Sequence, residues 1–159
     1  MNTPNTPICI IGAGPAGAAT SLMLSKLQVP HTIIDKAVFP RDKVCGDGLI
    51  LYVFQVLKKL DPNLLDQFVK HPDFLHSHKG KFFVNDQLPI RINVPKKKVH
   101  APIFYGKRID FDYFLVKNLP SDYADIRLDC GLKNIERQET DAPLLLTLDD
   151  GTQLTTSLV

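Results

Sequence analysis

The stretch Pro7–Gly17, PICIIGAGPAG, decides the fold of this chain. A short run of mostly β-branched apolar residues ends at a glycine, which predicts a buried parallel strand at Pro7–Ile11. Small and apolar residues then recur at helical spacing over Pro15–Leu27, and His31–Asp35 predicts a second strand. A strand, a tight glycine turn, a helix and a strand within about 30 residues predict a βαβ unit in a parallel sheet.

The spacing of the glycines in this turn suits the binding of a pyrophosphate. Gly12 permits the sharp turn after the strand, Gly14 lets the backbone approach the phosphates, and Gly17 allows close packing of helix on strand. Backbone N–H groups at the start of the helix, around Pro15 and Ala16, then face the phosphates at the positive end of the helix dipole. Pro15 is tolerated there because its missing N–H would have no partner within the helix.

Asp35 follows the glycine turn by about 20 residues, at the end of the second predicted strand. Dinucleotide-binding folds use an acidic residue at this point to accept a hydrogen bond from a ribose hydroxyl group. We therefore expect an α/β fold with a Rossmann-like FAD/NAD(P)-binding domain. The carboxylate repels a 2′-phosphate, which disfavours NADP as the resident dinucleotide, while spacing alone leaves NAD and FAD both open. The alternative is a glycine-rich surface turn in which Asp35 is an ordinary loop carboxylate.

The composition is that of an ordinary globular protein. The chain has 159 residues and a formal charge of +2, so no global charge points to nucleic acid. Three scattered cysteines without a CxxC pair predict neither a disulfide framework nor a zinc site, and the histidines lack the accompanying ligands of a metal site. The apolar run Ile8–Ile11 is too short to span a membrane. We expect a soluble, cytoplasmic protein without a metal.

The rest of the sequence predicts one FAD-binding domain over residues 1–159, with a parallel sheet and β-hairpins. A β-hairpin insertion at residues 72–106 is expected to begin a substrate-binding subdomain. The final strand is apolar at its end, so we expect the fold to continue beyond Val159 and the domain to be incomplete at its C-terminus. The predicted elements are helices Leu49–Leu60, Asn63–Val69 and Ile109–Leu119, hairpin strands Lys81–Asn85 and Pro89–Val94, and strands Ile126–Asp129, Leu132–Ile135, Leu144–Leu148 and Thr152–Val159.

The loop after Asp35 resembles a motif of one flavoenzyme family. Its residues Phe39–Gly48, FPRDKVCGDG, are similar to the FPR-x-K-x-CG-x-G loop of the geranylgeranyl reductase family of FAD-dependent oxidoreductases, which share the para-hydroxybenzoate hydroxylase fold. The stretch Arg108–Leu115, RIDFDYFL, resembles the R-x-x-F/L-D-x-x-L motif of that family. The late Asp150-Gly151 turn and its strand resemble the approach to the second flavin motif of the family. The resemblance covers the whole chain but only the N-terminal part of the family's length.

This resemblance implies that FAD is the bound dinucleotide. By position, the glycine turn would hold the pyrophosphate through its backbone, Asp35 would bind the adenosine ribose, and Leu132 would contact adenine. Cys45 and Gly46 match the loop that approaches the flavin, and Arg108 matches an arginine near the cofactor. The cofactor-binding residues that we expect are Gly12, Gly14, Pro15, Ala16, Gly17, Asp35, Lys36, Arg41, Cys45, Gly46, Arg108 and Leu132.

Three of these residues also fit other roles. Cys45 fits a small buried apolar residue, because nothing in the sequence supplies a base that would activate it. Arg41 fits a solvated charge in a loop. Arg108 fits an ion pair with one of the two aspartates on its own helix, Asp110 and Asp112.

The family resemblance implies an enzyme in which reduced flavin delivers hydride to a carbon–carbon double bond of an isoprenoid. Because flavin carries such chemistry, we expect no catalytic side chain, and NAD(P)H is a candidate transient electron donor. We expect a small apolar substrate, isoprenoid or aromatic, and a lipid substrate would bring peripheral membrane association. One alternative is an FAD-dependent aromatic monooxygenase or halogenase. Another is a non-catalytic dinucleotide-binding fragment.

Overall fold

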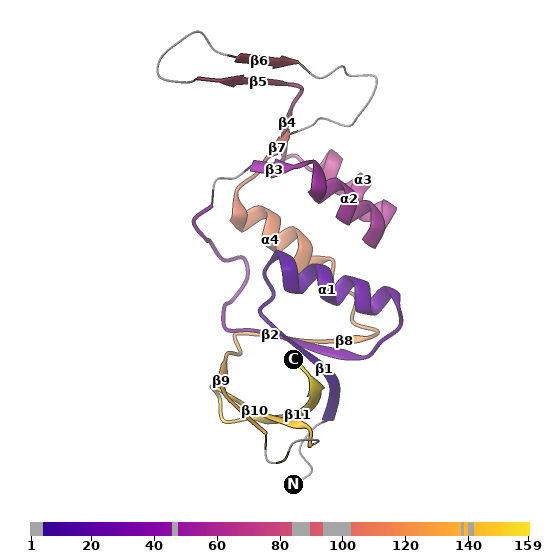
Figure 1. The fold of residues 1–159 in the computed structure, drawn as a ribbon, viewed down its shortest axis with the longest axis vertical. Helices are drawn as coiled ribbons and strands as arrows, with labels where there is room; N and C mark the ends of the chain where they lie inside the picture. The colour runs from indigo at the N-terminus through magenta and orange to yellow at the C-terminus, as the bar shows by residue number, and fades with distance from the viewer. Residues whose placement is uncertain (1–4, 46–47, 84–89, 94–102, 138, 140–141) are drawn as a thin grey trace. The chain divides into compact units, whose positions relative to one another are not determined.

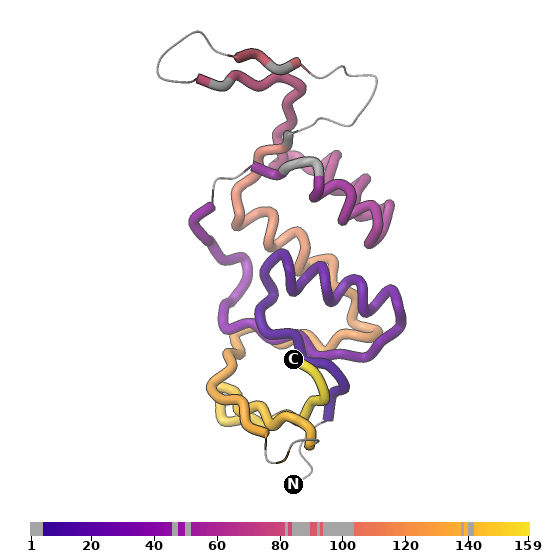
Figure 2. Tube along the Cα trace, in the orientation of Figure 1, coloured from indigo at the N-terminus to yellow at the C-terminus, as the bar shows by residue number. Residues whose placement is uncertain are grey.

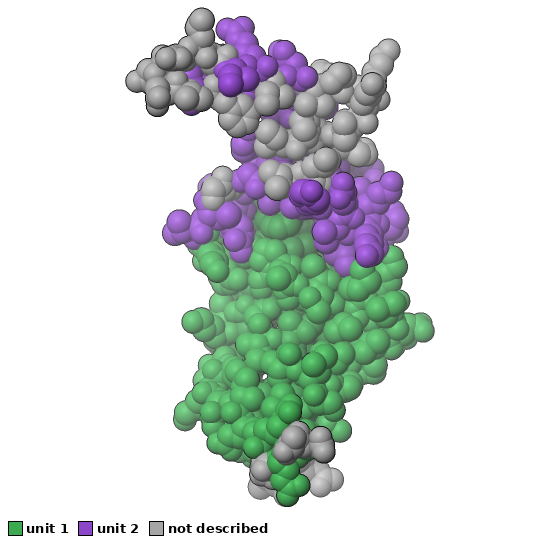
Figure 3. All heavy atoms as spheres, viewed as in Figure 1, with its two compact units in different colours: residues 1–43, 109–159 green, residues 44–108 purple. Residues whose placement is uncertain are grey.

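The computed structural model describes residues 5–45, 48–83, 90–93, 103–137, 139 and 142–159. The chain divides into two compact units, and no sheet of the described residues is shared between them. Unit 1 contains residues 1–43 and 109–159, and unit 2 contains residues 44–108 (Figure 3). Among the helices of the described residues, none is both long enough and apolar enough to cross a membrane.

Unit 1 is built on a mixed sheet that contains the predicted βαβ unit. Its strands are β1 (Asn5–Ile11), β2 (His31–Asp35), β8 (Ala124–Leu128), β9 (Leu132–Arg137), β10 (Leu144–Leu148) and β11 (Gln153–Leu158). They form one six-stranded sheet in the order β8-β2-β1-β11-β10-β9 (Figure 1). β8, β2, β1 and β11 are parallel to one another, and β11, β10 and β9 form an antiparallel meander.

Helix α1 (Pro15–Lys26) connects β1 to β2 and packs on both strands (Figure 1). It begins after Gly14 as its N-cap, with Pro15 in the first turn, as the sequence predicts. Every residue of β2 is buried, which is typical of a central parallel strand covered on both faces. A second helix, α4 (Arg108–Lys117), precedes β8 and buries Phe111 and Leu115. The predicted βαβ unit is confirmed.

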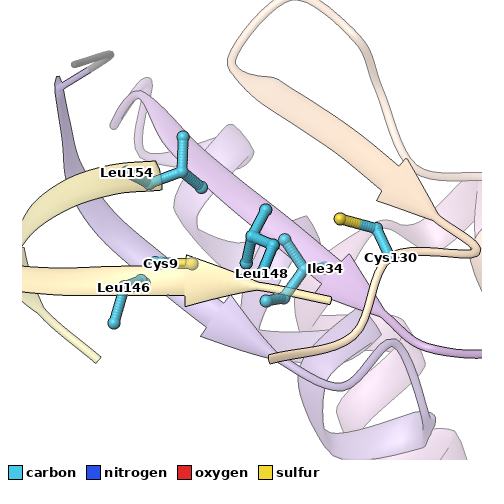
Figure 4. Packing of buried hydrophobic residues seen from close by; sticks show 6 residues of the cluster. All are labelled: Cys9, Ile34, Cys130, Leu146, Leu148 and Leu154. Carbon is cyan, nitrogen blue, oxygen red and sulfur yellow. The ribbon is translucent and has the colours of Figure 1, made fainter. Parts of the chain in front are cut away.

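The core of unit 1 joins the two ends of the sequence. β1 and β11 run side by side, with Asn5 opposite Thr155, which the trace shows as indigo beside yellow (Figure 2). Apolar side chains from both ends of the sequence pack in one cluster, and their burial supplies the main stabilisation of the unit. The cluster consists of Cys9, Ile34, Cys130, Leu146, Leu148 and Leu154 (Figure 4).

A buried polar contact links α1 to β2. The Ser21 hydroxyl lies 2.7 Å from Nε2 of His31, and Nδ1 of the same ring lies 2.9 Å from the carbonyl oxygen of Val29. A carbonyl oxygen only accepts, so Nδ1 carries a hydrogen and donates it. Both side chains are buried, and the contact satisfies polar groups that would otherwise be costly inside the unit. Ser21 therefore joins α1 to β2 through a polar contact as well as by packing.

In the part of unit 2 that the structure describes there are two short helices and two small sheets. The elements are β3 (Gly48–Ile50), α2 (Leu51–Leu60), α3 (Pro62–Lys70), β4 (Leu75–Ser77), β5 (Lys79–Phe82), β6 (Ile90–Asn93) and β7 (Ile103–Tyr105). β7 lies between β3 and β4, while β5 and β6 form a separate antiparallel pair. Phe68 packs against Phe54, Phe74 and Phe104, with ring centroids 4.6 to 5.7 Å apart.

The structure differs from the sequence prediction mainly in unit 2. The helix expected from Leu49 begins at Leu51, because Leu49 is in β3 and pairs with Phe104 of β7. β3, β4 and β7 were not predicted, since strands of three residues are too short to show alternation. The hairpin pairing of β5 with β6 is confirmed, and its expected turn at residues 85–87 lies outside the described residues.

Candidate dinucleotide site

The glycine turn between β1 and α1 has the geometry that its sequence predicts. Gly12 has a φ of 101°, a left-handed conformation that favours glycine. A side chain at Gly17 would overlap the carbonyl oxygen of Gly12 and press on Ile10, so only glycine allows the helix to lie this close. The start of α1 thus stands directly above the end of β1, with its first N–H groups directed out of the helix.

The Asp35 side chain accepts hydrogen bonds from two backbone N–H groups, one in the glycine turn and one in the loop after β2. One carboxylate oxygen accepts a hydrogen bond from the N–H of Ala13 at 2.7 Å, and the other accepts from the N–H of Ala37 at 2.8 Å. The side chain ties the glycine turn to the loop after β2 and is itself buried. A carboxylate has about four acceptor positions, so these two bonds leave capacity for a ribose hydroxyl group. The alternative of an ordinary loop carboxylate is wrong.

A cavity of about 550 Å³ opens beside Asp35. The segment before β9 also lines the cavity and is held on the end of β2, because the N–H of Cys130 donates to the carbonyl oxygen of Asp35 at 2.9 Å. Gly131 donates to the carboxylate of Asp149 at 2.9 Å, and a side chain there would come within 2.5 Å of that carboxylate. The lining residues are Ile11, Gly12, Ile34, Asp35, Lys36, Ala37, Arg41, Asp42, Lys43, Cys130, Gly131 and Leu132.

Arg41 connects this cavity to α4. Its Nη1 lies 3.3 Å from the carboxylate of Asp112, which has an exposed fraction of 0%, while the Arg41 side chain is 20% exposed. A Cβ at Gly14 would lie 3.2 Å from Nη2 of Arg41, so the other arm of the guanidinium faces the glycine turn. The guanidinium also lies over the ring of Phe39, 5.1 Å from its centre. The alternative of a solvated loop charge is therefore wrong for Arg41.

The structure brings together most of the predicted cofactor residues. Lys36 and Leu132 line the same cavity as Asp35 and Arg41, and Gly14 lies beside Arg41. Pro15, Ala16 and Gly17 form the first turn of α1.

The three remaining predicted residues are not among those that line this cavity in unit 1. Cys45 and Arg108 belong to unit 2, and Gly46 lies outside the described residues. Cys45 is exposed, so the alternative of a buried apolar residue is wrong for it. The roles of Cys45, Gly46 and Arg108 stay predictions.

The cysteines of unit 1 are unreactive in character. Burial raises the pKa of the Cys9 thiol to about 11, and burial likewise raises the pKa of Cys130. Both therefore remain neutral thiols at physiological pH and pack as small apolar groups. Among the residues that the structure describes, no cluster of histidine, cysteine, aspartate and glutamate could hold a metal ion.

Sequence reasoning missed three features of the site. It did not anticipate the ion pair between Asp112 and Arg41, which are 71 positions apart in the chain. It did not find the two backbone N–H groups that hold Asp35, or the need for glycine at position 131. No local sequence pattern signals any of these three features.

These residues suit the adenosine diphosphate half of a dinucleotide: a glycine cradle, an acid at the ribose position and a fixed guanidinium at the turn. A family model described as an FAD binding domain matches residues 5–157. The chain belongs to this family. FAD is accordingly the cofactor of this FAD-binding domain, and NAD, which the spacing alone left open, is not favoured.

The chain is also similar in sequence to individual proteins, a reductase and a halogenase. The chain is 38% identical over 152 residues to menaquinone reductase of Mycolicibacterium smegmatis, covering 95% of this chain and 35% of that protein. It is 26% identical over 122 residues to tryptophan 2-halogenase of Chondromyces crocatus, covering 74% of this chain and 22% of the halogenase. The chain thus spans about a third or less of the length of these relatives.

A solved structure shows that the fold is shared. The flavin-dependent monooxygenase PieE, determined with FAD and substrate, matches with a TM-score of 0.75 and 16% identity. The match covers 98% of this chain and 30% of that one. The α/β fold predicted from the sequence is confirmed, and the FAD-binding domain is of the kind found in FAD-dependent oxidoreductases.

Proposed function

We propose that the protein containing this chain is an FAD-dependent reductase that saturates a carbon–carbon double bond of an isoprenoid. The bound flavin supplies the hydride and electron chemistry. The residues of this chain bind and orient it: Asp35 at the ribose, the glycine turn and Arg41 at the pyrophosphate. Two electrons and two protons are added across the double bond, and NAD(P)H is the proposed source of the electrons.

The observation that carries this proposal is the 38% identity to a menaquinone reductase over 95% of the chain. Menaquinone is a quinone with an isoprenoid side chain, so a substrate of this chemical class fits that relative. The FPRDKVCGDG loop at residues 39–48, which resembles the geranylgeranyl reductase family, also supports an isoprenoid substrate. The substrate-binding role of the subdomain beginning at residues 72–106 is part of this proposal.

The test is an assay of the protein encoded by the whole gene. The FAD-loaded protein is incubated without oxygen with NADPH and either menaquinone or geranylgeranyl diphosphate, and products are weighed by mass spectrometry. The proposal predicts a product that is heavier by two hydrogen atoms and stays so after re-oxidation in air, because reduction of the quinone ring alone adds two hydrogen atoms that air removes. No such product from either substrate, together with oxygen or halogen added to an aromatic substrate in air, would replace it.

The second candidate is an FAD-dependent aromatic monooxygenase or halogenase. It is favoured by the similarity to a tryptophan 2-halogenase and by the fold shared with a flavin-dependent monooxygenase. These activities use the same N-terminal FAD-binding domain. The assay separates them from reduction because they need oxygen and add an atom other than hydrogen. If this chain acts by itself, a third reading is a dinucleotide-binding fragment without catalysis.

We further propose peripheral membrane association, with the protein in the cytoplasm and its substrate in the lipid. Between Lys79 and Lys107 the sequence has seven lysines and arginines and one acidic residue, although the whole chain has a charge of only +2. Within this segment β5 and β6 place Lys81 opposite Arg91. Opposed like charges destabilise a strand pair, and an anionic surface would relieve their repulsion.

Vesicle flotation tests this association. The chain should float with vesicles of phosphatidylcholine and phosphatidylglycerol and remain in solution with phosphatidylcholine alone. Replacing Lys81 and Arg91 by glutamine should weaken flotation, whereas the same change at Lys58 and Lys59 of α2 removes equal charge elsewhere and should not. Equal effects of the two double variants would rule out a specific role for the hairpin.

A further inference from the structure

We propose that Asp112 is a positioning residue that holds Arg41 over the glycine turn, where the guanidinium binds the pyrophosphate of FAD. The inference rests on the assignment of unit 1 to FAD binding and assigns a function to a residue of α4. It connects two stretches that the sequence presents separately, FPR at residues 39–41 and RIDFD at residues 108–112.

The first step of the argument is the burial of Asp112. Its side chain has an exposed fraction of 0% and lies on α4 between the buried Phe111 and Phe114. Removing a carboxylate from water is strongly unfavourable unless a positive charge and hydrogen bonds compensate for it. An apolar residue at this position would serve the packing of α4 at lower energetic cost, so the charge needs a reason beyond stability.

The second step is the orientation of the guanidinium. Nη1 of Arg41 faces Asp112 at 3.3 Å, and Nη2 faces the Cα of Gly14, where a Cβ would be only 3.2 Å away. One arm is therefore anchored and the other is presented at the start of α1. Arginine suits this division because its five N–H donors are fixed in one plane, which lysine does not offer.

The third step is the restriction of the loop side chain. The ring of Phe39 lies 5.1 Å from the guanidinium carbon, within the range of a cation–π contact. Arg41 is thus held from two sides before any ligand arrives. A pre-oriented donor loses less conformational entropy on binding, which strengthens its contact with a phosphate oxygen.

The last step is electrostatic. The N-cap of α1 is Gly14, which has no side chain to cap the helix, so the dipole and the first N–H groups are available to an anion. An arginine at the same point adds a full positive charge to these partial ones. Asp112 balances that charge at Nη1 of the guanidinium, while Nη2 faces the turn.

A double-mutant cycle tests the proposal on the intact chain. Arg41→Gln, Asp112→Asn and the double variant are titrated with FAD, ADP and adenosine, and thermal unfolding is measured for each. We expect Arg41→Gln to weaken FAD and ADP by roughly 10- to 100-fold, as for a charged hydrogen bond, and to leave adenosine unchanged. Asp112→Asn should weaken ADP by about tenfold, and the double variant should bind no worse than Arg41→Gln.

Two further variants keep the proposal testable if Asp112→Asn does not fold. Arg41→Lys retains the charge but cannot reach Asp112 and the turn together, so it should lose most of the ADP affinity of the wild type. Asp125→Asn removes the partner of Arg127 in an exposed ion pair of unit 1, and it should change nothing.

The outcomes are distinct. Unchanged ADP affinity in folded Asp112→Asn, full affinity in Arg41→Lys, or additive losses in the double variant would each overturn the positioning role. If the wild-type chain binds adenosine but gains nothing from the phosphates of ADP, the pyrophosphate site fails and this inference fails with it.

Discussion

At the scale of single residues, Asp35 has two functions that a simple alanine variant would confuse. It holds Ala13 and Ala37 through their N–H groups, and it is assigned to the adenosine ribose. Asp35→Ala should weaken FAD binding by at least about tenfold and also lower the free energy of unfolding by roughly 1–3 kcal/mol, because one buried and one part-buried donor lose their acceptor. Titration with FAD and urea unfolding measure the two effects.

The ribose role of Asp35 has a readout that stability does not affect. The wild-type chain should prefer ADP-ribose over its 2′-phosphorylated form because the carboxylate repels the extra phosphate, and Asp35→Ala should lose most of this preference. Asp42→Ala is the matched control, since it removes an exposed carboxylate from the same cavity. Unchanged preference in Asp35→Ala would remove the ribose assignment.

Because Cys9 is buried, the free energy of unfolding of unit 1 is expected to fall as pH rises through the alkaline range. The pKa of its thiol rises from an ordinary 9.0 to about 11, so the unfolded chain releases this proton more readily than the folded chain. The contribution of the neutral thiol is complete below about pH 9 and is lost by about pH 11, amounting to roughly 2–3 kcal/mol. Urea unfolding across this pH range should show a smaller fall in the free energy of unfolding for Cys9→Ala than for the wild-type chain. An equal fall in both would contradict a role of the Cys9 thiol in this pH dependence.

At the scale of elements, the parts that sequence predicts well are those with a strong local pattern. β2 is found at the predicted residues, and α1 ends one residue before the prediction, because each has a clear period and a clear stop. Strands of three residues in unit 2 have no period to detect. The pairing of Arg41 with Asp112 depends on how distant elements pack, which no local pattern contains.

Substitutions at two glycines of the turn between β1 and α1 are expected to affect different properties, one the stability of unit 1 and the other the binding of FAD. Gly17→Ala should destabilise unit 1 by about 2–4 kcal/mol, because its Cβ would overlap the backbone of Gly12. Gly14 has an ordinary φ of −66°, and its Cβ would meet only the end of the Arg41 side chain. Gly14→Ala should therefore change stability by less than about 1 kcal/mol yet weaken FAD binding about tenfold. The opposite ranking in thermal unfolding and FAD titration would show that the turn is misassigned.

At the scale of the whole molecule, the two units hold different parts of the predicted site. The residues matched to the ribose, the adenine and the pyrophosphate line one cavity or lie beside it in unit 1. Cys45 and Arg108, matched to the neighbourhood of the flavin, belong to unit 2. The sequence predicts cofactor residues in both units, and their division between units arises from packing over the whole chain.

This division predicts which half of FAD the chain recognises. Because Asp35, Arg41, Leu132 and the glycine turn all address adenosine diphosphate, the 159-residue chain should bind FAD and ADP with dissociation constants within about tenfold of each other. FMN, which lacks the adenosine, should bind at least about tenfold more weakly than either. Competition titrations against FAD, followed by flavin fluorescence, measure all three. Tight binding of FMN would place the main contacts at the flavin end, whereas FAD binding without competition from ADP would locate recognition outside this cavity.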